Sequence, residues 1–97
     1  MKFEWDEAKN ESNLEKHGLD FEDAAKLFDG PILVTLDTGQ DYGEERWLGL
    51  GLIEHRAVVA AYTYRGSETV RIISMRKALP HETLRYQQFL QDQLGSN

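Results

Sequence analysis

The side chains of this 97-residue chain that could carry out chemistry are mostly arginines. All of them lie in its second half, at Arg46, Arg56, Arg65, Arg71, Arg76 and Arg85. A guanidinium group donates paired hydrogen bonds that match the oxygens of a phosphate. Residues 1–45 carry four lysines and thirteen Asp or Glu, a net charge of −9. Residues 46–97 carry six arginines, one lysine and four Asp or Glu, a net charge of +3. This pattern predicts either a phosphate-binding half beside an acidic half, or simply two solvated faces of opposite sign.

Arg76 is the arginine with the most unusual expected position. The two-residue period of a strand puts Arg71 and Arg76 on opposite faces, with Arg76 sharing a face with Ile72 and Ser74. A charge is uncommon beside an isoleucine in a sheet. Arg76 therefore either reaches solvent at the strand end, pairs with Glu82, or is positioned to bind a phosphate.

His17 and Glu82 are the candidates for general base and general acid. Tyr86 lies one turn past Glu82 on the same helix face. Each residue also has a structural explanation. A lone helical histidine is commonly structural, Glu82 opposes the dipole of a helix N-terminus, and Tyr86 suits a core.

Several other kinds of chemistry are excluded or unsupported. The chain has no cysteine, which excludes disulfides and thiolate zinc sites. Its histidines, His17, His55 and His81, lack metal-ligand spacing, so we expect no metal site. There is no glycine-rich phosphate loop, H-E-x-x-H or G-x-S-x-G motif. The N-terminus lacks the apolar segment of a signal peptide and no apolar run is long enough to span a membrane, so the expected location is cytoplasmic.

Two helices should position the first of these residues. One is expected from its cap Asp6 to Gly18, with a polar face made of Lys9, Asn13, Lys16 and His17. The second is expected to begin at Asp20 and end at Gly30-Pro31. Its predicted apolar stripe consists of Phe21, Ala24, Ala25 and Phe28.

Four strands are expected next, over residues 32–37, 45–53, 56–64 and 69–76. The short turns between them predict an antiparallel meander, with a bend at Gly49 and Gly51. Pro80 suits the start of a last helix whose apolar stripe is Tyr86, Phe89, Leu90 and Leu94. The fold class is therefore α+β, with two N-terminal helices, a four-stranded antiparallel meander sheet and a C-terminal helix in a single domain, residues 1–97.

The strands over 56–64 and 69–76 are apolar on both faces. Such strands need cover on both sides. Either the helices divide between the two faces, or one face stays open for a partner.

Three blocks of the sequence together resemble one known family. They are Phe3-Glu-Trp5-Asp6-Glu-Ala-Lys9 with Asn13, Lys16-His17-Gly18, Phe21, Ala24 and Phe28; Gly43-Glu44-Glu45-Arg46 with Tyr62-Thr63-Tyr64-Arg65; and Arg71-Ile72-Ile73-Ser74-Met75-Arg76-Lys77-Ala78 with Glu82 and Tyr86. In this order they resemble the BrnT family of type II toxins, over residues 3 to 89. Family members commonly have a histidine where this chain has Tyr42, and a basic run where it has 79–84.

The resemblance implies a RelE-like fold and metal-independent ribonuclease activity, without a cofactor. It also implies a BrnA-like antitoxin partner of ribbon–helix–helix type, through which alone the toxin would reach operator DNA. The expected reaction is attack of the RNA 2′-OH on the adjacent phosphate. Within it we assign catalysis to His17, Arg46, Arg76 and Glu82, and RNA binding to Lys16, Arg65, Lys77 and Tyr86.

Two other classes of function are weighed against a ribonuclease. A non-enzymatic interaction module would bind a protein through the open sheet face, and the net charge of −6 favours this alternative. A DNA-binding regulator is disfavoured, because the second helix is followed by Gly-Pro and strands rather than by a recognition helix.

Overall fold

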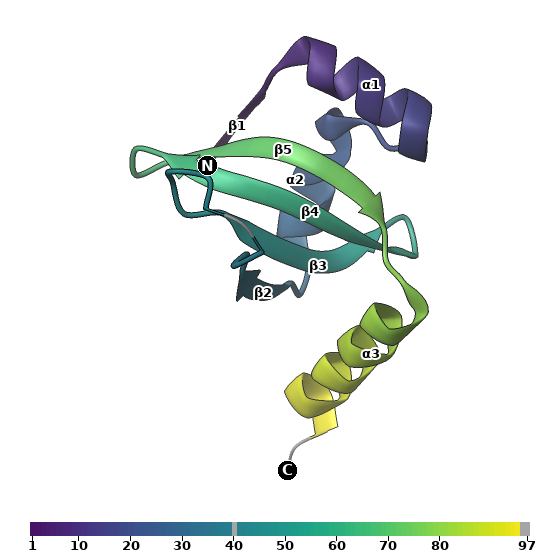
Figure 1. Cartoon of the computed structure of the whole chain (residues 1–97). Coiled ribbons are helices and arrows are strands. Elements are labelled where there is room, and N and C mark those ends of the chain that lie inside the picture. The colour runs from purple at the N-terminus through teal and green to yellow at the C-terminus, as the bar shows by residue number, and fades with distance from the viewer. Residues whose placement is uncertain (40, 96–97) are drawn as a thin grey trace.

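The computed structural model describes residues 1–39 and 41–95. It consists of a five-stranded mixed sheet and three α-helices (Figure 1). In chain order the elements are β1 (Lys2–Trp5), α1 (Glu7–His17), a 3₁₀ turn (Phe21–Asp23), α2 (Ala24–Asp29), β2 (Leu33–Leu36), β3 (Trp47–Ile53), β4 (Arg56–Arg65), β5 (Thr69–Lys77) and α3 (Pro80–Gly95). The α+β class, the antiparallel run from β2 to β5 and the three helical regions agree with the sequence prediction.

The predicted four-stranded antiparallel sheet is wrong in one respect, because a fifth strand completes it. β1 pairs in parallel with β5, and the strand order is β1-β5-β4-β3-β2. Lys2 lies opposite Thr69 and Trp5 lies opposite Ile72. The chain therefore begins in the sheet, and α1 starts at the point where β1 leaves β5.

The helix boundaries follow the predicted caps. The Asp6 carboxylate accepts the N–H of Lys9 at 3.2 Å, and Gly18 ends α1 in the left-handed region at φ 70°. The Asp20 carboxylate accepts the N–H of Glu22 at 3.0 Å. The second helical region thus begins as a 3₁₀ turn before it becomes α2.

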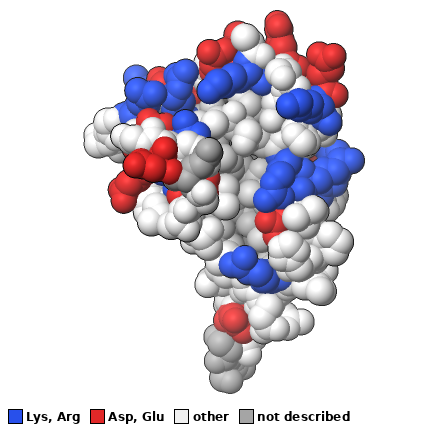
Figure 2. Space-filling model, in the orientation of Figure 1, with Lys and Arg blue, Asp and Glu red and all other residues white. Residues whose placement is uncertain are grey.

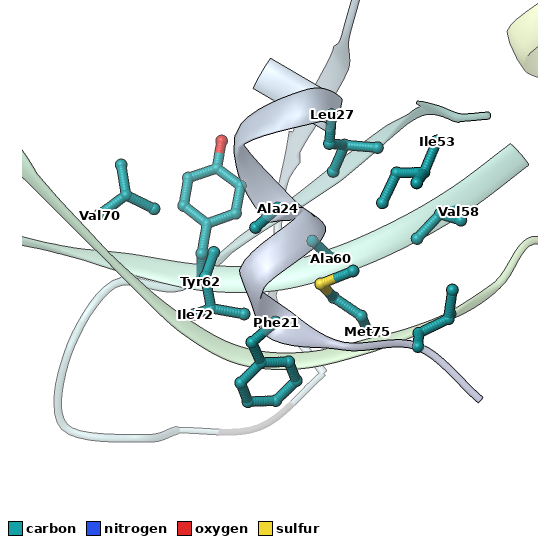
Figure 3. Close-up of a cluster of buried hydrophobic side chains, with 11 residues drawn as sticks. Phe21, Ala24, Leu27, Ile53, Val58, Ala60, Tyr62, Val70, Ile72 and Met75 are labelled. Carbon is teal, nitrogen blue, oxygen red and sulfur yellow. The ribbon is translucent and has the colours of Figure 1, made fainter. Parts of the chain in front are cut away.

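The main core lies between the sheet and the α1–α2 side (Figure 3). Phe21, Ala24 and Leu27 of the helical segment belong to one buried cluster with Ala60 and Tyr62 of β4. The predicted stripe is corrected at one position, because Leu27 is buried where Ala25 was expected. The short 3₁₀ turn before α2 changes the rotation of the helix and so brings a different residue onto the core.

Gly49 is required by packing and does not mark the predicted bend. β3 pairs with β4 without interruption from Trp47 to Ile53. A Cβ atom at Gly49 would lie 2.7 Å from Cδ1 of Ile32 and 3.2 Å from Cε1 of Tyr62. The glycine leaves room for these two side chains over the centre of the sheet.

The irregularity of the sheet lies instead in β5. Ala61 is opposite Ser74, whereas Tyr62 is opposite Ile72, so Ile73 is an extra residue. A bulge of this kind reverses the faces of the residues that follow it. Arg71 and Arg76 therefore lie on the same face, and the predicted placement of Arg76 beside Ile72 is wrong.

Two asparagines, Asn10 and Asn13, are the buried polar residues of α1. The Asn13 side chain accepts the N–H of Met75 at 3.1 Å and donates to the carbonyl of Leu19 at 3.1 Å. The Asn10 side chain accepts the N–H of Phe21 at 2.9 Å and donates to Asp20. α1 is thus attached to β5 and to the following loop mainly by hydrogen bonds.

The helices divide between the two faces of the sheet, as one of the two alternatives expected. On the face opposite α2, Tyr86 of α3 packs with Leu50 and Val59, and its hydroxyl donates to the carbonyl of Pro31 at 2.6 Å. α3 leaves the end of β5 and projects beyond β3 (Figure 1). It therefore covers only one end of this face.

Candidate active site

Most of the arginines lie on the sheet face opposite α2, which we call the arginine face. The pairing register places the side chains of Arg65, Arg71 and Arg76 there, in line with Thr63 and Val59. Arg46 precedes Trp47, whose side chain packs against the main core, so Arg46 points to the same face. Arg85 of α3 lines a pocket on it. In Figure 2 basic side chains lie above, to the right of and below a largely uncharged centre, and acidic side chains lie to its left.

Arg76 and Glu82 form the closest ion pair of this face. The two guanidinium nitrogens Nη1 and Nη2 lie 2.7 and 2.9 Å from the two carboxylate oxygens of Glu82. Glu82 also accepts the N–H of Leu79 at 2.8 Å. The Arg76 hydrogen bond is the main cause that lowers the pKa of Glu82 to about 2, against the opposing effect of burial. Glu82 is therefore ionised at neutral pH in this conformation, the form in which a carboxylate can accept a proton.

This ion pair predicts a pH-dependent contribution to stability. Because the folded-state pKa of Glu82 is lowered from 4.5 to about 2, the contribution is complete above pH 4.5 and is lost as the pH falls towards 2. Glu82→Gln should lower the free energy of unfolding at pH 7 by about 1–2 kcal/mol, since Arg76 is partly screened by solvent. Urea unfolding of both proteins at several pH values measures the difference. A difference that stayed constant down to pH 2 would contradict the assignment.

Arg46 is held at the other end of the arginine face. Its Nε donates to Glu44 at 3.1 Å, and its guanidinium carbon lies 3.9 Å above the ring of Tyr42. The Tyr42 hydroxyl donates to Asp37 at 3.3 Å. Arg46 is therefore positioned by its neighbours, but its interactions do not involve Arg76.

The two arginines share a face without converging on a single point. Arg76 lies opposite Val59, whereas Arg46 adjoins the Trp47–Tyr62 pair. This separation is four residues along the strands, or roughly 13 Å. The two guanidinium groups are held by different partners, Arg46 by Glu44 and Arg76 by Glu82. Arg46 and Arg76, both assigned to catalysis from the sequence, thus occupy two basic positions along one surface.

Two pockets accompany these positions. The first lies between α3 and the sheet and is lined by Leu33, Thr35, Leu48, Leu50, Val59, Glu82 and Arg85. The second lies beside the N-terminal end of β3 and is lined by Glu44, Glu45, Trp47, Thr63, Tyr64 and Arg65. Sequence reasoning did not select Arg85, although its spacing of three residues from Glu82 on a helix places the two side chains on one face.

The remaining predicted residues lie elsewhere. His17 and Lys16 are exposed in a cleft between α1 and β5 and line neither of these two pockets. Lys77 is exposed at the end of β5, and the register turns it away from the arginine face. Tyr86 is only 2% exposed and belongs to the packing beneath α3, which corrects the prediction that it contacts RNA.

Within residues 1–39 and 41–95, no three His, Asp or Glu side chains gather where they could hold a metal ion. In the same part of the chain, no helix combines the length and apolar character needed to cross a membrane.

Comparison with known proteins gives one consistent result. Residues 5–82 match the family described as ribonuclease toxin, BrnT, of type II toxin-antitoxin system. The fold is similar to the crystal structure of the Brucella abortus ribonuclease toxin BrnT, with a TM-score of 0.62 and 32% sequence identity. That match covers 81% of this chain and 97% of the Brucella chain. A comparison with curated proteins gave no match.

Proposed function

The chain belongs to the BrnT family of ribonuclease toxins of type II toxin–antitoxin systems, and from this we propose that it cleaves RNA on the arginine face without a metal ion. The observation that carries the proposal is the gathering of Arg46, Arg65, Arg71, Arg76 and Arg85 on one face of a protein whose net charge is −6. Guanidinium groups can stabilise the charge that develops on phosphate oxygens. In an acidic protein, this grouping makes the arginine face a favourable surface for phosphate.

The proposed reaction is an intramolecular transesterification. The RNA 2′-oxygen attacks the adjacent phosphorus, the bond from phosphorus to the 5′-oxygen breaks, and the products are a 2′,3′-cyclic phosphate and a 5′-OH. Arg76 binds the non-bridging oxygens, while Arg46 and Arg65 bind neighbouring phosphates of the strand. The 5′-oxygen takes its proton from water.

Glu82 is the proposed acceptor of the 2′-OH proton. Its low pKa results mainly from the hydrogen bond with Arg76. When Arg76 turns to a substrate phosphate, that hydrogen bond weakens, and the pKa of Glu82 rises towards its usual value. Substrate binding would therefore make the carboxylate a stronger base at the moment when it is needed.

The reaction predicts defined products. The purified chain, incubated with RNA and an excess of chelator, should yield fragments with 2′,3′-cyclic phosphate and 5′-OH ends. Mass spectrometry of the fragments identifies both termini, and an RNA with 2′-O-methyl groups should remain intact as the control. If the unmodified RNA also remains intact, the ribonuclease proposal is rejected, and the alternative of a non-enzymatic interaction module remains. Cleavage that stops with chelator would reject metal independence.

The partner implied by the family is an antitoxin, and we propose one of ribbon–helix–helix type that also binds operator DNA. A basic antitoxin segment would be attracted to the acidic N-terminal half of the chain, where residues 1–45 carry a net charge of −9. Calorimetric titration with the product of the adjacent gene measures this interaction. No binding at micromolar concentration would reject this partner.

A further inference from the structure

A cleft between α1 and β5 contains cationic side chains that the proposed reaction does not use. It is lined by Lys9, Ser12, Asn13, Lys16 and His17 from the helix and by Ile73 and Ser74 from the bulge of β5. Within the part of the chain that the structure describes, no ion pair involves Lys9, Lys16 or His17. The cleft thus combines three unpaired basic groups with two hydroxyls, the donors that bind phosphate oxygens.

The charges of α1 are separated between two sides of the helix. At 100° per residue, Lys9, Ser12 and Lys16 lie on the side that faces the cleft. Glu11 and Glu15 project from the opposite side and are exposed. The charged side chains of α1 that line the cleft are therefore all basic.

Stabilisation of the helix itself does not explain the position of Lys9. Lys16 and His17 stand in the last turn of α1, where a cation interacts favourably with the helix dipole. Lys9 stands in the first turn, where the dipole disfavours a cation. Lys9 and Lys16 nevertheless line the same cleft, which indicates a common ligand.

The cleft opens towards the arginine face at the edge of β5. β1 pairs with β5 only as far as Ile72, so among the described residues no strand continues beside this edge of β5 after that point. Because of the bulge, Ser74 lies opposite Ala61 on the arginine face, two residues from Arg76. A chain bound at Arg76 therefore has a direct route over this edge to Lys16.

We propose that the cleft between α1 and β5 binds the phosphate backbone of the same single-stranded RNA, several nucleotides from the bond that is cleaved. This inference rests on the proposed function for the identity of the ligand. The cleft acts as a backbone contact, so it contributes affinity and salt dependence without reading sequence. His17 is then a phosphate contact of this cleft, and it replaces its expected role as base or acid.

The test compares three proteins by their affinity for an uncleavable 2′-O-methyl RNA of about twelve nucleotides. Lys9→Glu/Lys16→Glu should weaken binding about tenfold or more, and reduce the slope of log affinity against log salt by about 1.4, or about 0.7 for each lost phosphate contact. The effect should shrink when the RNA is shortened to about four nucleotides, which do not reach from Arg76 into the cleft.

The third protein distinguishes the effect of the lysine positions in the cleft from the effect of the net charge. Lys9→Glu/Lys16→Glu/Glu11→Lys/Glu15→Lys keeps the net charge of −6 and the composition of α1, but moves the positive groups to the far side. It should bind the long RNA as weakly as the double variant. Wild-type affinity in either variant, with an unchanged circular dichroism spectrum, would overturn the proposal. If the wild-type protein does not cleave RNA, the proposed function is rejected, but the binding measurements still test whether the cleft binds RNA.

Discussion

Replacing Arg76 with alanine should lower kcat for RNA cleavage about 10²–10³-fold, the usual effect of removing one group that stabilises developing negative charge. Arg76 is oriented by a bidentate ion pair, because both of its terminal nitrogens are bound to Glu82. Arg76→Lys should recover little activity, since an ammonium group lacks the planar pair of donors. Single-turnover cleavage of a labelled RNA measures both variants.

Two controls separate catalysis from folding. Arg76→Ala leaves Glu82 without its partner, whereas Arg76→Ala/Glu82→Gln also removes the stranded charge. Urea unfolding of both variants measures how much stability the lost ion pair costs, separately from the cleavage rate. Arg56→Ala removes an exposed arginine at the turn between β3 and β4, away from the arginine face, and should retain the wild-type rate. If all of these folded proteins cleaved RNA at the wild-type rate, Arg76 would have no catalytic role.

The local elements were predictable because their signals lie within a few residues. Asp6 and Gly18 mark the two ends of α1 through caps that depend only on the neighbouring backbone. The turns between β2, β3, β4 and β5 follow directly from the sequence. β1 escaped prediction because four residues give a weak pattern, and its partner β5 lies more than sixty residues away in the chain. A parallel pair of this separation has no local signal.

The site was less predictable because the sheet face on which a side chain lies depends on the pairing register of its strand. The residues of the arginine face were all candidates by type, but a single extra residue, Ile73, moves Arg76 to the side of Arg71. The position of a bulge depends on how the two strands pair. Nothing in the sequence at Ala61 and Tyr62 indicates that the register of their partner strand shifts there. The assignment of His17 beside Arg76 and Glu82 relied on the family resemblance and on residue type. The structure separates these groups because α1 packs along the edge of β5, away from α3.

Asn13→Leu should reduce the free energy of unfolding by about 2–5 kcal/mol, although the change makes a buried residue more apolar. The side chain is 7% exposed and has a hydrogen-bond partner at each end of its amide, Met75 and Leu19. Leucine fills a similar volume but leaves a buried N–H and a buried carbonyl without partners, each costing about 1–3 kcal/mol. Thermal unfolding should show the melting temperature falling by roughly 10–30 °C.

Glu15→Leu is the matched control for Asn13→Leu, because it places the same side chain on the exposed side of α1 and should change stability little. Asn13→Asp separates the two hydrogen bonds, since a carboxylate still accepts from Met75 but no longer donates to Leu19. If the stability of Asn13→Asp lies between those of the wild type and Asn13→Leu, each hydrogen bond contributes part of the effect. Equal stability of the wild type and Asn13→Leu would contradict the structural role given to Asn13. Because Asn13 also lines the cleft with Lys9 and Lys16, the hydrogen bonds that hold α1 against β5 also fix the distance between the helix lysines and the arginine face. Loss of Asn13 should therefore weaken binding of the long RNA even under conditions in which the variant remains folded.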